Sequence, residues 1–256
     1  MRRVQVSRDI PYSPGQDMCA DIYAPVDINK STPLVVFFYG GRWRQGRKQD
    51  YLFVAHALAT HGVCCVLPDY RRFPEVQFPV FIEDGAKALA WAASNIEGFG
   101  GTADNVFVMG HSAGAHIASM IALNSGYRQP FDNTNSTLRG LIGLSGPYDF
   151  LPMRNDDVIE VFGDKATSME SQPIHYASAD APPSLLVTSK QDIIVCPRNA
   201  HRLAEALTNH GVSVETSVFS NLTHTGTLLA LAAPLRWRAP VLEHILGFIR
   251  RQAIAP

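Results

Sequence analysis

The chain has 256 residues, of which 46% are hydrophobic, so it is long enough to bury the core of one α/β domain, which we expect to cover residues 1–256. Its 22 Lys and Arg residues nearly balance its 23 Asp and Glu residues, and the formal net charge of -1 gives no electrostatic reason to expect nucleic acid or an anionic membrane as a partner. We therefore expect the ligand to be a small molecule.

The sequence predicts no membrane segment. Residues 1–9 are partly basic but are followed by no apolar stretch, and no apolar run approaches the length of a membrane-spanning helix. A cytoplasmic protein, present as a monomer or a homodimer, is expected.

The four cysteines have no spacing typical of metal ligands. Cys64 and Cys65 lie inside an apolar run at residues 62–67, where cysteine behaves as a small hydrophobic residue. We expect these thiols, together with those of Cys19 and Cys196, to be buried and to bind no metal.

Short apolar runs alternate with longer amphipathic or apolar segments along the chain. Two short strands are expected first, at residues 4–6 and 18–23, with Pro11, Pro14 and Gly15 marking the turn between them. Buried strands are then expected at residues 34–39, 63–67, 106–109, 141–144, 185–188 and 212–219, and crossover helices at about 49–61, 79–96, 112–125, 197–210 and 239–252. This alternation predicts an α/β fold with a mostly parallel central sheet, helices on both faces and an antiparallel edge.

The longest stretch of weak periodicity runs from about residue 146 to residue 183. A segment of this length is a candidate lid or substrate-pocket loop. Five apolar side chains in and before it have two interpretations, lining an acyl pocket or completing the core: Phe73, Phe78, Phe150, Met153 and Phe162.

The most informative motif is Gly110-His111-Ser112-Ala113-Gly114, which follows the apolar strand at 106–109 and precedes an apolar helical segment. A strand, a Gly-x-Ser-x-Gly turn and a helix together form a nucleophile elbow. The two glycines let backbone segments pass close together, so that a sharp turn lifts the hydroxyl above the sheet. Ser112 is the predicted nucleophile.

A serine nucleophile needs a general base and an acid that orients the base, in the chain order Ser, Asp or Glu, His. Asp192 lies just beyond the strand at 185–188, at the carboxyl end of a parallel strand, where α/β sites collect. It is the predicted acid. Asp149, which follows an earlier strand, and Asp180, which precedes the strand at 185–188, fit less well.

His224 is the predicted base, because it follows the last strand in a polar loop that can fold back over the elbow. His175, in the segment of weak periodicity, is the alternative candidate for the base that the sequence does not exclude. The histidines that fall in predicted helices or beside the nucleophile are expected to have packing or surface roles: His111, His116, His201, His210 and His244.

Backbone donors for an oxyanion are expected at two places. Ala113, directly after the nucleophile, supplies one N–H group. Gly41 and Arg42 are expected to supply the others, because a strand that ends in paired glycines can turn its N–H groups inward. Gly40 is an alternative donor, or serves only to permit the turn.

These motifs together resemble the serine esterases of the α/β-hydrolase superfamily, in particular the group that includes hormone-sensitive-lipase-like carboxylesterases and the kynurenine formamidase or feruloyl-esterase-like enzymes. The resemblance covers nearly the whole chain, extends to residues 68–71, 78–79 and 83–84, and implies an α/β-hydrolase fold. The family's oxyanion motif usually begins with His, whereas Tyr39 stands here and is expected to alter the pocket floor. The resemblance also implies a structural pair between Asp69 and Arg71.

The implied function is hydrolysis of small carboxylic esters with short acyl chains, through a Ser112, His224 and Asp192 triad and an acyl-enzyme, with no metal or organic cofactor. One alternative is an arylformamidase that cleaves a formyl amide. The other is a hydrolase-fold protein that binds a ligand without catalysis.

Basic residues cluster beside the oxyanion loop, at Arg42, Arg44, Arg47 and Lys48. They are interpreted either as a site for a substrate carboxylate or as a solvated basic face, and the second interpretation is preferred.

Overall fold

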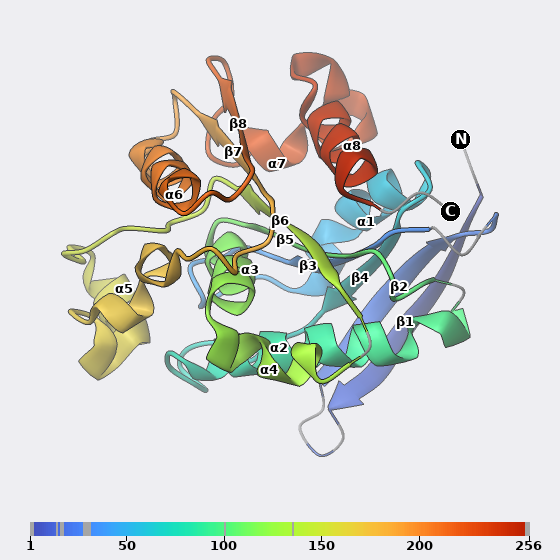
Figure 1. Cartoon of the computed structure of the whole chain (residues 1–256), viewed down its shortest axis with the longest axis horizontal. Helices are drawn as coiled ribbons and strands as arrows, with labels where there is room; N and C mark the ends of the chain where they lie inside the picture. Colours follow the sequence, from blue (N-terminus) through green and yellow to red (C-terminus); the bar gives the residue numbers. More distant parts are fainter. Residues whose placement is uncertain are drawn as a thin grey trace.

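The computed structural model describes residues 3–13, 15, 18–27, 32–99, 101–134 and 136–253, which leaves Pro14 of the expected first turn outside the described residues. Within these ranges the strands form one eight-stranded sheet in the order β1-β2-β4-β3-β5-β6-β7-β8 (Figure 1). The strands are β1 Val4–Ser13, β2 Met18–Pro25, β3 Leu34–Phe38, β4 Cys64–Pro68, β5 Val106–His111, β6 Leu138–Leu144, β7 Ser184–Ser189 and β8 Val214–Phe219.

The sheet has an antiparallel edge and a parallel body. β1 pairs with β2 and β2 with β4 in antiparallel fashion, whereas β4, β3, β5, β6, β7 and β8 pair in parallel. The predicted antiparallel edge and mostly parallel sheet are confirmed. β1 extends beyond the expected residues 4–6. The sequence pattern missed the rest of it because the side chains of this edge strand are mostly exposed or half-buried and form no apolar run.

Helices cover both faces of the sheet, with α2, α3 and α4 together on one side and α8 on the other (Figure 1). The predicted crossover helices correspond to α1 Leu52–Ala59, α2 Val80–Asn95, α3 Ala113–Leu123, α6 Arg198–Asn209 and α8 Val241–Gln252. Three helices were not expected: α4 Ser125–Asp132, α5 Asp156–Phe162 and α7 Gly226–Leu229. They are short, and α4 contains Pro130, so none offers the apolar periodicity of a longer helix.

The part of the chain that the structure describes includes no helix with both the length and the hydrophobicity to cross a membrane. Most buried side chains belong to one core cluster on the two sides of the sheet.

Lys48 is buried, with only 1% of its side chain exposed, although its sequence context favoured a solvated basic face. Its ammonium nitrogen Nζ lies 2.8 Å from Asp9, 3.2 Å from Asp21 and 3.1 Å from Asp69, so it joins the antiparallel strands β1 and β2 to the loop after β4. Burial lowers the pKa of Lys48, but the hydrogen bond that it donates to Asp9 and the attraction of Asp69 and Asp21 outweigh burial and raise the pKa above its ordinary value. The solvated interpretation is wrong for this residue.

The expected pair between Asp69 and Arg71 is also wrong. Asp69 accepts from Lys48, and Arg71 instead donates through Nε and Nη2 to the carboxylate of Asp84, at 2.9 and 2.8 Å. Asp84 lies in α2 and is fully buried, so this pair fixes α2 to the loop after β4.

Replacing Lys48 with methionine is expected to lower the free energy of unfolding by about 3–5 kcal/mol, because the buried carboxylate of Asp21 would lose its counter-charge. Urea denaturation measures this loss. The matched control is Arg47→Met, which breaks the exposed pair with Asp50 and should cost less than about 1 kcal/mol. Equal losses in the two variants would contradict a structural role for the Lys48 cluster.

Candidate active site

Ser112 stands at a sharp turn between β5 and α3. Its backbone has φ 54° and ψ -121°, a conformation that non-glycine residues rarely adopt. A Cβ atom on Gly110 would lie 2.2 Å from the carbonyl oxygen of Gly114, and one on Gly114 would lie 2.0 Å from that of Phe38. Both glycines of the motif are therefore required by close backbone approach, as the elbow interpretation expects.

The side chains of Ser112, His224 and Asp192 form a continuous hydrogen-bonded chain. His224 Nε2 lies 2.9 Å from Ser112 Oγ, and His224 Nδ1 lies 2.8 Å from Asp192 Oδ2. These residues follow β5, β8 and β7, whose carboxyl ends share one edge of the sheet. The structure brings together the three predicted residues, whereas Asp149 pairs with Arg202.

The environment of Asp192 favours its ionised form. Burial raises the pKa of this carboxyl, but the hydrogen bond from His224 and those from the backbone N–H groups of Val195 and Ile194, at 2.8 and 3.0 Å, outweigh burial and lower it below its ordinary value. A carboxylate only accepts hydrogen bonds, so Nδ1 of His224 carries the proton and Nε2 is free to accept from the Ser112 hydroxyl.

Two further hydrogen bonds hold the backbone of His224. Its carbonyl oxygen accepts from His111 Nε2 at 3.1 Å and from the Thr227 hydroxyl at 2.8 Å. Ser145, after β6, lies 3.0 Å from that hydroxyl and supports it. Thr227 was not identified from the sequence, because a threonine in a four-residue helix has no pattern that distinguishes it from an ordinary polar residue.

His111 and His116 have the packing and hydrogen-bonding roles expected of them. His116 donates through Nε2 to the carbonyl of Ser171 at 2.9 Å and lies against Trp43, so it ties α3 to the segment that follows β6. Burial lowers the pKa of each of these histidines to about 4. Both are neutral at pH 7.

The loop after β3 adopts an unusual backbone conformation beside the elbow. Gly41 has φ 129°, and Arg42 and Trp43 follow with φ 55° and 57°. Gly40 passes so close that a Cβ there would lie 3.2 Å from Cβ of Ser112. The loop therefore passes directly beside Ser112, where the predicted oxyanion donors are needed.

Two of the three predicted oxyanion donors line the cavity at Ser112. Among the described residues, no acceptor is found for the backbone N–H of Arg42 or of Ala113. Gly41 is not part of the lining, so the geometry favours Arg42 and Ala113. Their role as donors stays a prediction.

Tyr39 packs into the core and does not form the pocket floor as expected. Its buried ring stacks on Tyr70 and Tyr51, with centroids 4.4 and 5.5 Å away, and the Tyr70 hydroxyl donates to the Tyr39 carbonyl at 2.7 Å. The cavity lining does not include Tyr39. Replacement of the usual His therefore changes the support of the oxyanion loop and leaves the cavity surface to other residues.

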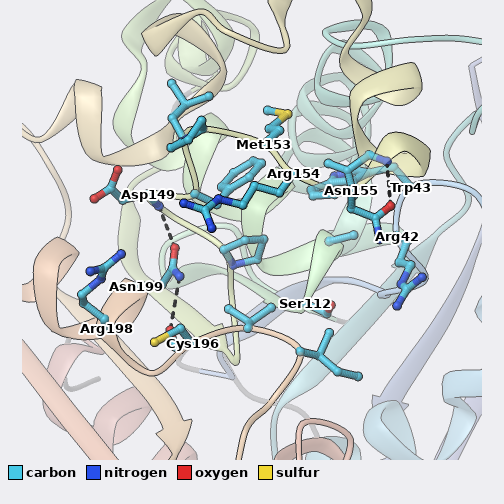
Figure 2. Close-up of a pocket in the computed structure, with 18 residues that line it drawn as sticks. Arg42, Trp43, Ser112, Asp149, Met153, Arg154, Asn155, Cys196, Arg198 and Asn199 are labelled. Atoms are coloured by element: carbon cyan, nitrogen blue, oxygen red, sulfur yellow. Dashed lines mark hydrogen bonds between the residues drawn. The ribbon is translucent and has the colours of Figure 1, made fainter.

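The cavity that opens above Ser112 has a volume of about 580 Å³ (Figure 2). Its lining comes from the loop after β3, the elbow, the loop after β6, the loop after β7 and the first turns of α5 and α6. The lining residues are Arg42, Trp43, Ser112, Ala113, Pro147, Asp149, Phe150, Leu151, Pro152, Met153, Arg154, Asn155, Val158, Ile194, Val195, Cys196, Arg198 and Asn199.

Of the five apolar side chains expected either to line an acyl pocket or to complete the core, some do the one and some the other. Phe150 and Met153 line the cavity. Phe78 and Phe162 are buried and stack with centroids 5.2 Å apart, so they complete the core. Phe73 lies beneath the guanidinium of Arg44, 4.2 Å from ring centroid to Cζ.

Cys196 is exposed at the cavity, which contradicts the expected burial of all four thiols. Cys64 and Cys65 are buried in β4, as expected, and Cys19 is half-buried. The expectation was wrong for Cys196 because this cysteine follows β7 in a loop, where no apolar run surrounds it.

The loop after β6, residues 146–155, is held in place by side chains from elsewhere. Asn199 Oδ1 accepts from the backbone N–H groups of Tyr148 and Asp149, both at 2.8 Å, and Gln172 Oε1 accepts from that of Phe150 at 2.8 Å. This part of the segment 146–183 is an anchored wall of the cavity. Asn199 and Gln172 were missed because isolated amide residues give no sequence signal of a tertiary contact.

The two buried histidines predict a pH dependence of stability. In the unfolded chain these imidazoles titrate near 6.5, but in the fold near 4, so the unfolded state binds more protons between these values. The free energy of unfolding is expected to be fully developed above pH 6.5 and to decline as the pH falls toward 4, by a total on the order of a few kcal/mol.

Urea denaturation at pH 5 and pH 7 measures this decline. In His116→Phe the decline should be smaller, because one of the two groups no longer titrates, whereas the control His201→Gln changes an exposed histidine of α6 and should keep the full decline. An unchanged decline in His116→Phe would show that protonation of His116 does not drive it.

Comparisons with known proteins find a family model, esterases among the relatives and esterases of similar fold. The BD-FAE family model matches residues 20–207. A probable isoprenylcysteine alpha-carbonyl methylesterase of Oryza sativa subsp. japonica is 26% identical over 269 residues, covering 96% of this chain and 63% of that protein. Esterase LipQ of Mycobacterium tuberculosis is 27% identical over 262 residues, covering 94% of this chain and 62% of that protein. The chain thus spans less than two thirds of the length of these curated relatives.

A solved structure of an esterase from Rhizomucor miehei has a TM-score of 0.79 at 19% identity, covering 98% of this chain and 83% of that chain. At this identity the likeness concerns the fold, and it confirms the predicted α/β-hydrolase fold. The family model covers well over half of the chain. The chain therefore belongs to the BD-FAE family, within the α/β-hydrolase superfamily of esterases that its motifs resemble.

Proposed function

We propose that this protein is a serine hydrolase that cleaves small carboxylic esters, with Ser112 as nucleophile, His224 as general base and Asp192 as the acid that orients it. The observation that carries the proposal is the hydrogen-bonded chain from Asp192 through His224 to Ser112, with distances of 2.8 and 2.9 Å, at the base of a cavity. Nucleophile, base and orienting group within hydrogen-bond reach are the mark of an activated serine.

In the proposed reaction, His224 Nε2 takes the proton of the Ser112 hydroxyl as Oγ forms a bond to the ester carbonyl carbon. The imidazolium is stabilised by the Asp192 carboxylate. It then gives the proton to the leaving alcohol as the carbon–oxygen bond breaks, which leaves an acyl-enzyme. Water attacks the acyl carbon, His224 accepts its proton, and the acid is released as Ser112 recovers its hydrogen.

The backbone N–H groups of Ala113 and Arg42 are proposed to donate to the oxyanion that forms in both steps, with Gly41 as a third candidate. The free N–H groups of Ala113 and Arg42 at the cavity support this role. Donors fixed before the reaction stabilise the developing charge without reorganisation at the moment of attack.

The acyl group is proposed to be short. Phe150, Met153 and Val158 offer apolar contact within a cavity of about 580 Å³. The relatives reported above carry the names of ester hydrolases, which favours esters over the alternative of a formyl amide, and the intact hydrogen-bonded chain argues against a role in binding alone. A single domain, a cytoplasmic location and a monomer or homodimer stay predictions.

Replacing Ser112 with alanine is expected to lower kcat/KM on 4-nitrophenyl acetate by about 10,000-fold or more, because the covalent step is lost. The variant should also fail to react with a fluorophosphonate probe, which the wild type takes up once per chain. Ser125→Ala, an exposed serine at the start of α4, is the matched control and should retain both properties. Full activity in Ser112→Ala would refute the assignment.

Replacing Asp192 with asparagine tests the choice of acid. An amide no longer fixes the proton on Nδ1 of His224, so kcat is expected to fall by about 1,000- to 10,000-fold while KM changes little. Asp180→Asn, at the exposed position of a rejected candidate, should retain activity. The assignment would be wrong if the two variants lost activity equally.

A further inference from the structure

Three arginines from three different parts of the chain line the cavity at Ser112. Arg42 belongs to the oxyanion loop, Arg154 to the loop after β6 and Arg198 to the start of α6, and all three side chains are exposed. In the view of Figure 2, Arg42 and Arg198 lie on opposite sides of Ser112, with Arg154 between them on the wall.

None of these three guanidinium groups has a carboxylate partner within ion-pairing distance among the described residues. Arginines in the surrounding structure differ in this respect, since Arg44 pairs with Glu160 and Arg202 pairs with Asp149.

Asp149 is the one carboxylate in the cavity lining, and Arg202 already neutralises it. With Asp192 of the hydrogen-bonded chain as the other carboxylate of the site, the three unpaired arginines leave the cavity with a local positive charge, although the chain as a whole has a formal net charge of -1.

Position distinguishes this group of arginines from an ordinary solvated surface. Charges of one sign around a concave site concentrate the field inside it, so they act on any ligand that reaches Ser112. The arginine-bearing loops are also connected: Asn199, next to Arg198, accepts hydrogen bonds from the backbone of Tyr148 and Asp149, on the wall that continues to Arg154. Guanidinium groups are matched by geometry to carboxylates and related oxyanions.

We propose that the cavity recognises esters that carry an anionic group, such as a carboxylate, in addition to the ester bond. Arg154 and Arg198 bind that group and orient the ester over Ser112, and the side chain of Arg42 adds to the positive field. The inference rests on the proposed ester hydrolysis at Ser112 and specifies its substrate class. The anionic group belongs to the alcohol or to the acyl part of the ester, which the experiment distinguishes.

Two matched substrate pairs test the proposal. For the alcohol part, 4-acetoxybenzoate is compared with the uncharged 4-acetoxybenzamide; for the acyl part, the mono-4-nitrophenyl ester of adipic acid is compared with 4-nitrophenyl hexanoate. At low ionic strength, the charged member of at least one pair should have the higher kcat/KM, by about tenfold or more, mainly through a lower KM. Added sodium chloride should reduce this ratio, because ions screen exposed charges.

The double variant Arg154→Gln/Arg198→Gln should remove most of the preference, measured as the ratio of kcat/KM between the charged and the neutral member of a pair, so that a loss common to both members cancels. Arg250→Gln, an exposed arginine of α8 away from the cavity, removes one positive charge and should keep the preference.

The outcomes separate this inference from the proposed function. A wild type that hydrolyses the neutral esters in a Ser112-dependent way but favours neither charged ester would overturn the arginine proposal alone, as would a preference that survives in the double variant. Hydrolysis that persists in Ser112→Ala would instead overturn the proposed function.

Discussion

The close packing of α3 against the end of β3 is the constraint on which the site depends. The carbonyl oxygen of Phe38 comes within 2.0 Å of the place where a side chain on Gly114 would begin, so this crossing exists only with glycine. The same turn holds Ser112 at φ 54°, a strained value that the burial of every residue of α3 supports. Because the elbow is fixed on two sides, the loops after β7 and β8 can deliver Asp192 and His224 to a hydroxyl of defined position.

Ser112, Asp192 and His224 were predictable from the sequence for one physical reason. Each follows a strand whose residues are apolar enough to recognise, and parallel strands place their carboxyl ends along one edge of the sheet. Local pattern and chain order thus sufficed to select these residues from nine histidines and many carboxylates. The antiparallel edge of the sheet was equally predictable from the sequence, because a turn separates two extended segments before the parallel part begins.

Lys48 and the cavity wall could not be predicted, because they depend on contacts between distant parts of the chain. The sequence pattern around Lys48 predicts a surface residue. Its partners Asp9 and Asp21 lie on β1 and β2, 39 and 27 positions earlier in the chain. Arg154 and Arg198 are separated by 44 positions and line the same cavity only because the loop after β6 and the start of α6 fold beside each other. No periodicity connects such residues, so sequence patterns cannot group them.

Asn199 connects the wall of the cavity to the loop that carries Asp192. Its one amide oxygen accepts from two N–H groups of the wall, and the side-chain nitrogen of the same residue donates to the carbonyl of Cys196 at 3.2 Å, in the loop that also carries Asp192. The wall of the cavity and the loop that carries Asp192 are therefore joined through one side chain. Under the proposed function, a substitution that shifts this wall is expected to disturb the position of Asp192 as well, and so to change kcat together with substrate preference.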